Sequence, residues 1–295
     1  MAPGAMSLAQ VYDLLRCPVC ADLFDLDDRT LLCARGHAFD IARQGYVSLL
    51  SGRQVVGLRA DTADMLDARD RVMRAGLLDP IRDRVAASCV GTTTLEVGAG
   101  TGHYLAGCVQ AGPDGSRGVG IDLSKVSARR VARIHPDVGA VVADAWKPWP
   151  IGDHVVHTVL SVFSPRNTEQ CRRVLTDDGA LVMVTPTDRH LHELIEPMGM
   201  IGVDEEKTQR IDSAVHGVFD RWERNRVEYT VAVPRSGVID LVRMGPSAFH
   251  RSDAEIVGRA ARLPDVVDVT FSVVHSVFVP APAPAEPNAV QRTES

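Results

Sequence analysis

The sequence has no uninterrupted apolar segment close to the roughly 20 residues needed to cross a bilayer. Its first seven residues also lack the basic and then apolar layout of a secretion signal. The net charge is only −6 and the pI is about 5.9, so the whole chain has no excess of positive charge for binding nucleic acid. We therefore expect a cytoplasmic protein without membrane contact.

The composition excludes a wholly disordered or fibrous chain, because 45% of the residues are hydrophobic and 24% are charged. A length of 295 residues fits one large catalytic domain with a small appendage. We predict a lead-in over 1–15 that is frayed at its end, a small module over 16–57, an α/β domain over 58–279 and a disordered Pro/Ala-rich tail over 280–295.

Three of the six cysteines cluster near the start of the chain. The pattern Cys17-x2-Cys20-x12-Cys33-x3-His37 supplies four ligands for tetrahedral zinc and leaves no open position, which indicates a structural ion. A segment of this size needs such an external staple, because it buries little core of its own. The sequence favours a ribbon-like zinc module rather than a DNA-reading finger, and the alternative is an incidental group of cysteines.

A run of arginines follows the first zinc ligands. Between positions 29 and 59 there is a single acid, Asp40, and there are five arginines, namely Arg29, Arg35, Arg43, Arg53 and Arg59. Such a strip either contacts phosphates or forms a solvated surface.

The large segment alternates helix and strand patterns. The predicted helices are 61–75 and 80–85, and the predicted strands are 94–97, 118–122, 140–144, 158–163 and 180–185. This rhythm is typical of a doubly wound, mostly parallel sheet. Two later segments, 227–233 and 267–279, alternate apolar and polar residues and predict an antiparallel edge.

A glycine-rich turn follows the first of these strands. It contains Gly98, Gly100 and Gly102 in the pattern G-x-G-x-G, and Thr101 lies inside it. This spacing departs from the dinucleotide fingerprint. Glu96, two residues before the turn, would repel a pyrophosphate and tolerate a zwitterionic sulfonium ligand.

Carboxylates stand at the ends of the next two strands. Asp122 is placed to bind the hydroxyls of a ribose, and Asp144 is within reach of an adenine amino group. Together with the glycine turn, this is the layout of a class I S-adenosylmethionine-dependent methyltransferase. The alternatives are a nicotinamide or flavin enzyme, or a turn without a ligand.

The methyl acceptor is expected beside the segment 161–167, which follows the fourth strand. It lacks the Asn/Asp-Pro-Pro-aromatic cluster used on exocyclic amino groups, and no cysteine follows its proline. Phe163 either stacks on a flipped base or belongs to the core, and Arg166 is placed to hold a phosphate or a base edge.

These motifs together resemble the RlmA family of 23S ribosomal RNA (guanine-N1)-methyltransferases. The family motifs are the zinc cluster, Gly-Tyr-Val-Ser-Leu-Leu at 45–50, the glycine turn, Asp-Leu-Ser-Lys at 122–125 and Thr-Pro-x3-His-Leu-x-Glu-Leu at 185–194. The runs at 60–65, 162–167 and 244–247 are similar to its tylosin-resistance branch. The resemblance spans roughly 16–279.

The resemblance implies methylation of N1 of one guanine in a 23S rRNA hairpin loop near the macrolide site, with macrolide resistance as a consequence. It also implies a homodimer whose zinc modules recognise RNA. The family's cofactor contacts fall on Gly100, Thr101, His190 and Leu78, where the housekeeping branch has tyrosine at the last position.

Methylation at N1 requires loss of the N1 proton, so a general base is desirable. Asp61, Asp64 and Glu193 are candidates, each of which is also explained as a cap or surface acid, and none is assigned. His190 is placed to contact the cofactor carboxylate or to cap its helix. Two rival functions are a small-molecule (antibiotic) methyltransferase and a zinc-ribbon binding protein that only senses the cofactor.

Overall fold

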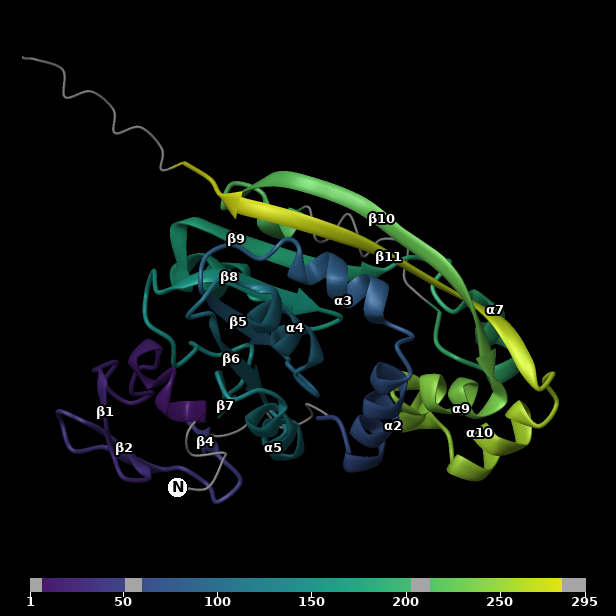
Figure 1. Ribbon diagram of the computed structural model, residues 1–295, viewed down its shortest axis with the longest axis horizontal. Coiled ribbons are helices and arrows are strands. Elements are labelled where there is room, and N and C mark those ends of the chain that lie inside the picture. Colours follow the sequence, from purple (N-terminus) through teal and green to yellow (C-terminus); the bar gives the residue numbers. More distant parts are fainter. Residues whose placement is uncertain (1–6, 51–59, 203–212, 283–295) are drawn as a thin grey trace, which may run out of the picture.

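The protein is built around one eight-stranded sheet (Figure 1). The computed structural model describes residues 7–50, 60–202 and 213–282. The sheet order is β10-β11-β9-β8-β5-β6-β7-β4. Its strands are β4 (Tyr46–Ser48), β5 (Thr93–Val97), β6 (Arg117–Asp122), β7 (Val138–Val142), β8 (Val156–Val162), β9 (Leu175–Pro186), β10 (Phe219–Pro234) and β11 (Val266–Pro280).

The predicted mixed sheet is confirmed. Strands from β4 to β9 pair in parallel, whereas β11 pairs antiparallel with both β9 and β10. The central strands β5 and β7 are buried along their whole length, which explains their continuous apolar character. The two antiparallel strands differ from their predicted segments. β10 has 16 residues and is longer than the predicted 227–233, and β11 is buried along most of its length rather than half-exposed.

Helices cover the sheet, and four of the described ones begin at a residue whose side chain caps the helix. Thr62 caps the helix predicted over 61–75 by accepting a hydrogen bond from the backbone N–H of Met65, and Gly76 follows with a φ of +72°. The helices are α2 (Ala63–Arg74), α3 (Asp79–Ala86), α4 (His103–Ala111), α5 (Lys125–Ile134), α6 (Thr168–Val174), α7 (His192–Met198), α9 (Arg235–Arg243) and α10 (Asp253–Ala260), with short 3-10 turns η1 (Tyr12–Leu14) and η2 (Pro246–His250). The four capped helices are α2, α5, α6 and α10.

The cysteine-rich module forms a separate three-stranded antiparallel sheet. Its strands are β1 (Phe24–Asp27), β2 (Thr30–Cys33) and β3 (Ala38–Asp40). In Figure 1 this sheet lies at the opposite end of the molecule from α9 and α10. The module predicted over 16–57 also contains β4, which pairs in parallel with β7 and therefore belongs to the large sheet.

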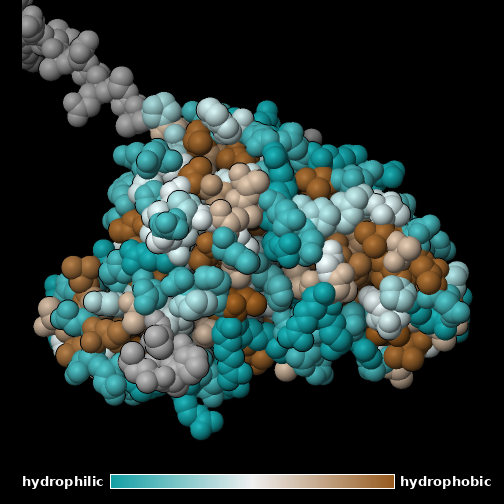
Figure 2. Space-filling model, viewed as in Figure 1, coloured by the Kyte–Doolittle hydropathy of each residue, from teal (hydrophilic) through white to brown (hydrophobic). Residues whose placement is uncertain are grey.

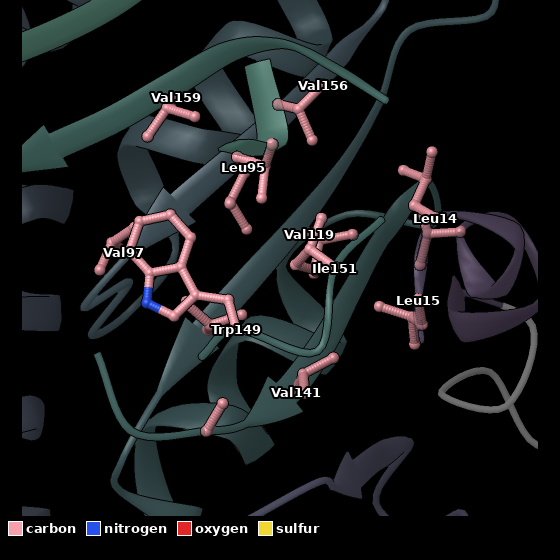
Figure 3. Close-up of a cluster of buried hydrophobic side chains, with 14 of the residues drawn as sticks. Leu14, Leu15, Leu95, Val97, Val119, Val141, Trp149, Ile151, Val156 and Val159 are labelled. Atoms are coloured by element: carbon pink, nitrogen blue, oxygen red, sulfur yellow. The ribbon is translucent and has the colours of Figure 1, made fainter. Parts of the chain in front are cut away.

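The described part of the lead-in packs against the large domain. Leu8, Val11 and Leu15 are fully buried, and Leu15 forms an antiparallel bridge with Ile151. Leu14 and Leu15 belong to the same buried apolar cluster as Ile151 (Figure 3). Apolar side chains at this spacing gain more from burial than the segment loses by becoming ordered. Residues 7–15 of the lead-in are therefore part of the folded core, and the fraying predicted for its end concerns residues outside the described ranges.

Other predictions fall on residues outside the described ranges. They concern the lead-in at residues 1–6, the domain boundary at 57/58, the arginines Arg53 and Arg59, and the tail from 283 onward. In the described part of the chain, none of the helices combines the length and the hydropathy needed to span a membrane.

Candidate active site and zinc centre

A cavity of about 970 Å³ opens at the carboxyl ends of the parallel strands. The loops that follow β5, β6, β7 and β8 contribute Gly98, Leu123, Ala145 and Phe163 to its lining, while α2, α9 and η2 contribute from the other side. The carboxyl ends of parallel strands are the usual ligand position in an open α/β sheet. The predicted cofactor position therefore coincides with a real cavity.

The glycine turn adopts left-handed backbone at all three predicted glycines. The φ angles of Gly98, Gly100 and Gly102 are +67°, +55° and +79°. A Cβ at Gly98 would lie 2.8 Å from Cβ of Ser164, and one at Gly100 would lie 2.7 Å from Nη1 of Arg69. The left-handed backbone favours glycine at both positions, and a Cβ at Gly100 would also require the guanidinium of Arg69 to move.

The three glycines do not have the same role. Gly98 and Thr101 line the cavity. Gly102 instead begins α4, and a Cβ there would lie 3.2 Å from Cγ2 of Ile134 in α5. Gly102 therefore allows α4 to approach α5, and its predicted cofactor contact remains a prediction.

Glu96 lies at the floor of the cavity and is 2% exposed. Its Oε2 accepts a hydrogen bond from the backbone N–H of Leu105, which caps the start of α4. Burial, with a smaller contribution from the nearby carboxylate of Asp122, raises the pKa of Glu96 to about 8. The Glu96 carboxyl is therefore mainly protonated at neutral pH in the ligand-free protein.

Asp122 and Asp144 lie at the ends of neighbouring strands and both line the cavity. The two oxygens of Asp122 accept hydrogen bonds of 2.9 and 2.8 Å from the backbone N–H groups of Gly100 and Ser124. Each oxygen keeps a second lone pair for a ligand hydroxyl. Asp144 is nearly buried, and its Oδ1 accepts from the backbone N–H of Trp146.

His190 and Leu78 also line the cavity, as the family resemblance implies. Nδ1 of His190 accepts a hydrogen bond from the backbone N–H of Ser272, so the ring proton belongs on Nε2. Burial lowers the pKa of His190 to about 4. His190 is therefore a neutral hydrogen-bond donor at neutral pH. Leu78 is 2% exposed and offers only an apolar surface.

Phe163 lies at the rim of the cavity. Its side chain is 41% exposed, its φ is +53°, and its ring centroid lies 5.8 Å from that of His190. The alternative that placed Phe163 in the core is therefore wrong. An exposed aromatic ring held in left-handed backbone at a cavity rim is available for stacking on a ligand.

The three candidate bases lie in different surroundings. Asp61 lines the cavity and forms a 2.7 Å ion pair with Arg69. Asp64 is exposed and is not part of the lining. Glu193 accepts hydrogen bonds from the backbone N–H and the hydroxyl of Thr270, so its carboxylate joins α7 to β11. Of the three, only Asp61 is near enough to meet a ligand in the cavity.

Two polar residues of the cavity were missed by the sequence reasoning, namely Arg69 and Tyr104. Arg69 lies on α2 and Tyr104 on α4, where an arginine or a tyrosine is ordinary. Only the position of Tyr104, two residues after Gly102, marked it as close to the turn.

The zinc ligands predicted from spacing converge in the structure. The ligand atoms of Cys17, Cys20, Cys33 and His37 all lie within 4.8 Å of one another. The two sulfurs of Cys20 and Cys33 are 3.7 Å apart, and Nδ1 of His37 lies 3.3 to 3.6 Å from the three sulfurs. Tetrahedral zinc requires about 3.8 Å between sulfurs and about 3.5 Å between sulfur and nitrogen. The cluster therefore fits a four-coordinate structural ion.

Two of the three described arginines of the strip bond within the module. Arg29 donates to the backbone carbonyls of Ile41 and Ala42, and Arg35 pairs with Asp22. Residues 16–50 contain four arginines against five aspartates. Figure 2 shows apolar residues at this end of the molecule, and the exposed ones in the module are Val19, Leu23 and Leu32.

Comparisons with known proteins agree with this architecture. The RlmA N-terminal zinc-ribbon family matches residues 15–54. The 23S rRNA (guanine(748)-N(1))-methyltransferase of Streptomyces fradiae is 38% identical over 279 residues, which covers 92% of this chain and 99% of that protein. A Micromonospora griseorubida protein named as a candidate 23S rRNA (guanine-N(1)-)-methyltransferase is 39% identical over 283 residues, covering 88% of this chain and 95% of its own.

A solved structure supports the fold. A chain of the complex between the Haloferax volcanii Trm112 methyltransferase activator and a methyltransferase matches with a TM-score of 0.50 and 17% identity. The match covers 76% of this chain and 99% of that chain. The predicted class I S-adenosylmethionine-dependent methyltransferase fold with an N-terminal zinc ribbon is confirmed.

Proposed function

The chain belongs to the RlmA family of 23S rRNA (guanine-N1)-methyltransferases, and from that premise we propose that it transfers the methyl group of S-adenosylmethionine to N1 of one guanine in 23S rRNA. The observation that carries this proposal is the cavity at the carboxyl ends of the strands, with Asp122 and Glu96 beside the glycine turn. The zinc ribbon on the same chain favours a macromolecular substrate over a small one.

The residues of the cavity have distinct roles in this proposal. Asp122 accepts hydrogen bonds from the ribose hydroxyls of the cofactor, and Asp144 meets its adenine amino group. Gly98, Gly100, Thr101 and Gly102 shape the turn beside it. Leu78 and His190 complete the wall, where His190 donates from Nε2 because its Nδ1 is already used.

The acceptor guanine enters at the rim, where Phe163 provides a face for stacking and Arg166 lines the cavity. The reaction is an in-line displacement at the sulfonium methyl group, so positioning of N1 is the main contribution of the protein. The lone pair of N1 becomes nucleophilic once its proton leaves. Asp61 lines the cavity but is paired with Arg69, so we assign no general base.

The finer features of this proposal rest on the family. The target is one guanine of the hairpin loop near the macrolide site, and its methylation confers macrolide resistance. The Streptomyces fradiae relative is named for guanine 748. We also propose a cytoplasmic homodimer in which the zinc ribbons contact the RNA.

The proposal is tested by incubating the protein with tritiated S-adenosylmethionine and 23S rRNA, followed by primer extension to locate the modified base. We expect one labelled guanine, with label absent from the Gly100→Arg variant because arginine fills the turn. Label on a different base position would contradict guanine-N1 methylation. Label that appears only on macrolides would support an antibiotic methyltransferase instead.

A further inference from the structure

We propose that the hydroxyl of Ser164 donates a hydrogen bond to O6 of the acceptor guanine and that Ser161 holds this hydroxyl in place, an inference that rests on the proposed function. Ser164 follows Phe163 in the loop after β8 and lines the cavity. Ser164 is then a catalytic residue, because it touches the reacting base, and Ser161 is a positioning residue. The group that Ser164 recognises is a carbonyl oxygen next to the nitrogen that accepts the methyl group.

Ser164 lies between the glycine turn and the exposed ring of Phe163. Phe163 has left-handed backbone directly after β8, and its N–H still donates to the carbonyl of Val184 in β9. The chain turns sharply there and brings Ser164 back against the glycine turn. A Cβ placed on Gly98 would lie 2.8 Å from Cβ and 3.7 Å from Oγ of Ser164. The Ser164 hydroxyl is therefore placed where a base stacked on Phe163 meets the cofactor.

The Ser161 hydroxyl determines which way the hydrogen bond between the two serines runs. The two Oγ atoms are 3.2 Å apart, and Ser161 is 2% exposed. In the described part of the chain, the Ser161 hydroxyl meets no hydrogen-bond partner other than Ser164. A buried hydroxyl with an unpaired proton costs free energy, so Ser161 donates and Ser164 accepts. The proton of Ser164 therefore stays available for an acceptor on a ligand.

A hydrogen-bond donor at this place supplies what the reaction needs at O6. When N1 loses its proton to solvent, the negative charge is shared between N1 and O6 of the guanine. The N1–C bond then forms as the C–S bond of the sulfonium breaks, which leaves a neutral methylated base and a neutral thioether. Ser164 keeps its proton throughout and stabilises the charge on O6, as the donors of an oxyanion hole do.

The test uses three synthetic RNA hairpins that carry the target loop and differ only in the acceptor base. Guanine and inosine both present O6, and inosine lacks the 2-amino group. 6-Thioguanine keeps N1–H and the amino group but has sulfur, a weak acceptor, in place of O6. Single-turnover methylation rates are measured for the full-length wild type and for Ser164→Ala.

We expect Ser164→Ala to slow methylation of guanine and of inosine by about 100-fold, which is the usual effect of removing one such donor. Methylation of 6-thioguanine should slow by less than about tenfold, because the wild type already lacks the strong hydrogen bond on this base. A general disturbance of the loop would instead slow all three bases equally.

Ser161→Ala tests the positioning residue. It leaves the Ser164 hydroxyl without its donor, and we expect a loss of about tenfold on guanine and inosine that again shrinks on 6-thioguanine. The matched control is Thr158→Val, which removes another buried hydroxyl of β8, bonded to backbone groups of Val90 and outside the cavity lining. This control should lower the free energy of unfolding and leave all three rates at their wild-type values.

Cofactor binding is measured separately, by calorimetry with S-adenosylhomocysteine, the thioether that methyl transfer leaves behind. We expect Ser164→Ala to bind it as tightly as the wild type does. A weaker affinity would assign the hydroxyl to the cofactor and overturn the inference.

The remaining outcomes separate this inference from the proposed function. If the wild type methylates neither 23S rRNA nor the guanine hairpin, the proposed function itself fails. If the wild type is active but Ser164→Ala slows all three bases equally or none of them, the contact with O6 is wrong and the methyltransferase assignment stands. A loss on guanine and 6-thioguanine but not on inosine would assign the hydroxyl to the 2-amino group instead.

Discussion

Glu96 combines two properties that are seldom found together, complete burial and a position facing a ligand cavity. Its pKa is about 8, against an ordinary value of 4.5, chiefly because burial disfavours the charged carboxylate. The native protein without ligand therefore holds one proton more than the unfolded chain between these two pH values. The free energy of unfolding falls as the pH rises through that interval.

We predict that Glu96→Gln removes this dependence, because glutamine keeps the hydrogen bond to Leu105 and cannot ionise. Between about pH 5 and pH 8, wild type should lose up to about 1.4 kcal/mol of stability per pH unit relative to the variant. Urea unfolding of both ligand-free proteins at several pH values measures the difference, in which other titrating groups cancel. Parallel curves would mean that Glu96 is charged in the native protein.

Single residues were predictable from sequence where a turn or a strand end fixes their place. Gly98 and Asp122 could be assigned because each directly follows or ends a strand, and the carboxyl ends of parallel strands meet at one edge. Arg69 and Tyr104 could not be assigned in this way. Whether their side chains line the cavity depends on which faces of α2 and α4 turn toward it, and the local sequence does not determine this.

At the scale of elements, the glycine turn joins β5 to α4, and the guanidinium of Arg69 packs against it at Gly100. We predict that Gly100→Ala weakens binding of S-adenosylhomocysteine, because the new Cβ would lie 2.7 Å from Nη1 of Arg69 and displace the guanidinium. Calorimetry should show a loss of about tenfold or more. An unchanged affinity would mean that the position of Arg69 does not matter for binding.

Gly115→Ala is the matched control for this variant. Gly115 also has a positive φ, +82°, but a Cβ there meets nothing within 4 Å. Both variants should lose about 1 kcal/mol of stability from left-handed backbone. Only Gly100→Ala should lose affinity for the ligand, which separates backbone strain from the effect on Arg69.

The elements themselves were largely predictable, because the strands from β5 to β9 are apolar runs bounded by turn signals and α2 begins at a capping threonine. β4 was missed as part of the large sheet. It has only three residues, and its partner β7 lies about 90 residues later in the chain. A pairing of this kind depends on the tertiary fold, which the local sequence does not encode.

At the scale of the whole molecule, the zinc ribbon and the methyltransferase domain share one core. Phe24, Leu31 and Leu49 belong to the same buried cluster as Val97 and Ile121. The backbone N–H of Leu49 also donates to the carbonyl of Val142, at the end of β7 and just before Asp144. The segment of β4 and Leu49, which directly follows the ribbon sheet in the chain, therefore joins the ribbon to the strand that leads into the proposed adenine side of the cavity.

We predict that losing zinc weakens cofactor binding as well as the ribbon itself. Zinc binding by the four protein ligands contributes folding free energy. Cys33→Ser should therefore lower the free energy of unfolding and speed hydrogen exchange in β7. It should also reduce the affinity of the protein for S-adenosylhomocysteine. Cys89→Ser is the control, since Cys89 is also a free cysteine but lies outside the cluster. Unchanged exchange in β7 of Cys33→Ser would mean that the ribbon is only a tether for RNA.

The zinc ligands could be predicted from spacing because two short knuckles are local features. The burial of the lead-in could not, since Leu8 and Val11 are covered by residues far along the chain. The bonding of the arginines could not be predicted either, because charge counting does not show that Arg29 and Arg35 bond within the module.

The bridge between Leu15 and Ile151 has a consequence for biosynthesis. The backbone N–H of Arg16 donates to the carbonyl of Pro150, and that of Gly152 donates to the carbonyl of Leu14. A nascent chain emerges from the ribosome amino end first, so the opening residues wait for about half of the polypeptide before their partners exist. During that interval the apolar side chains of Leu8, Val11 and Leu15 lack the partners that bury them, and an isolated amino-terminal fragment would keep this surface exposed.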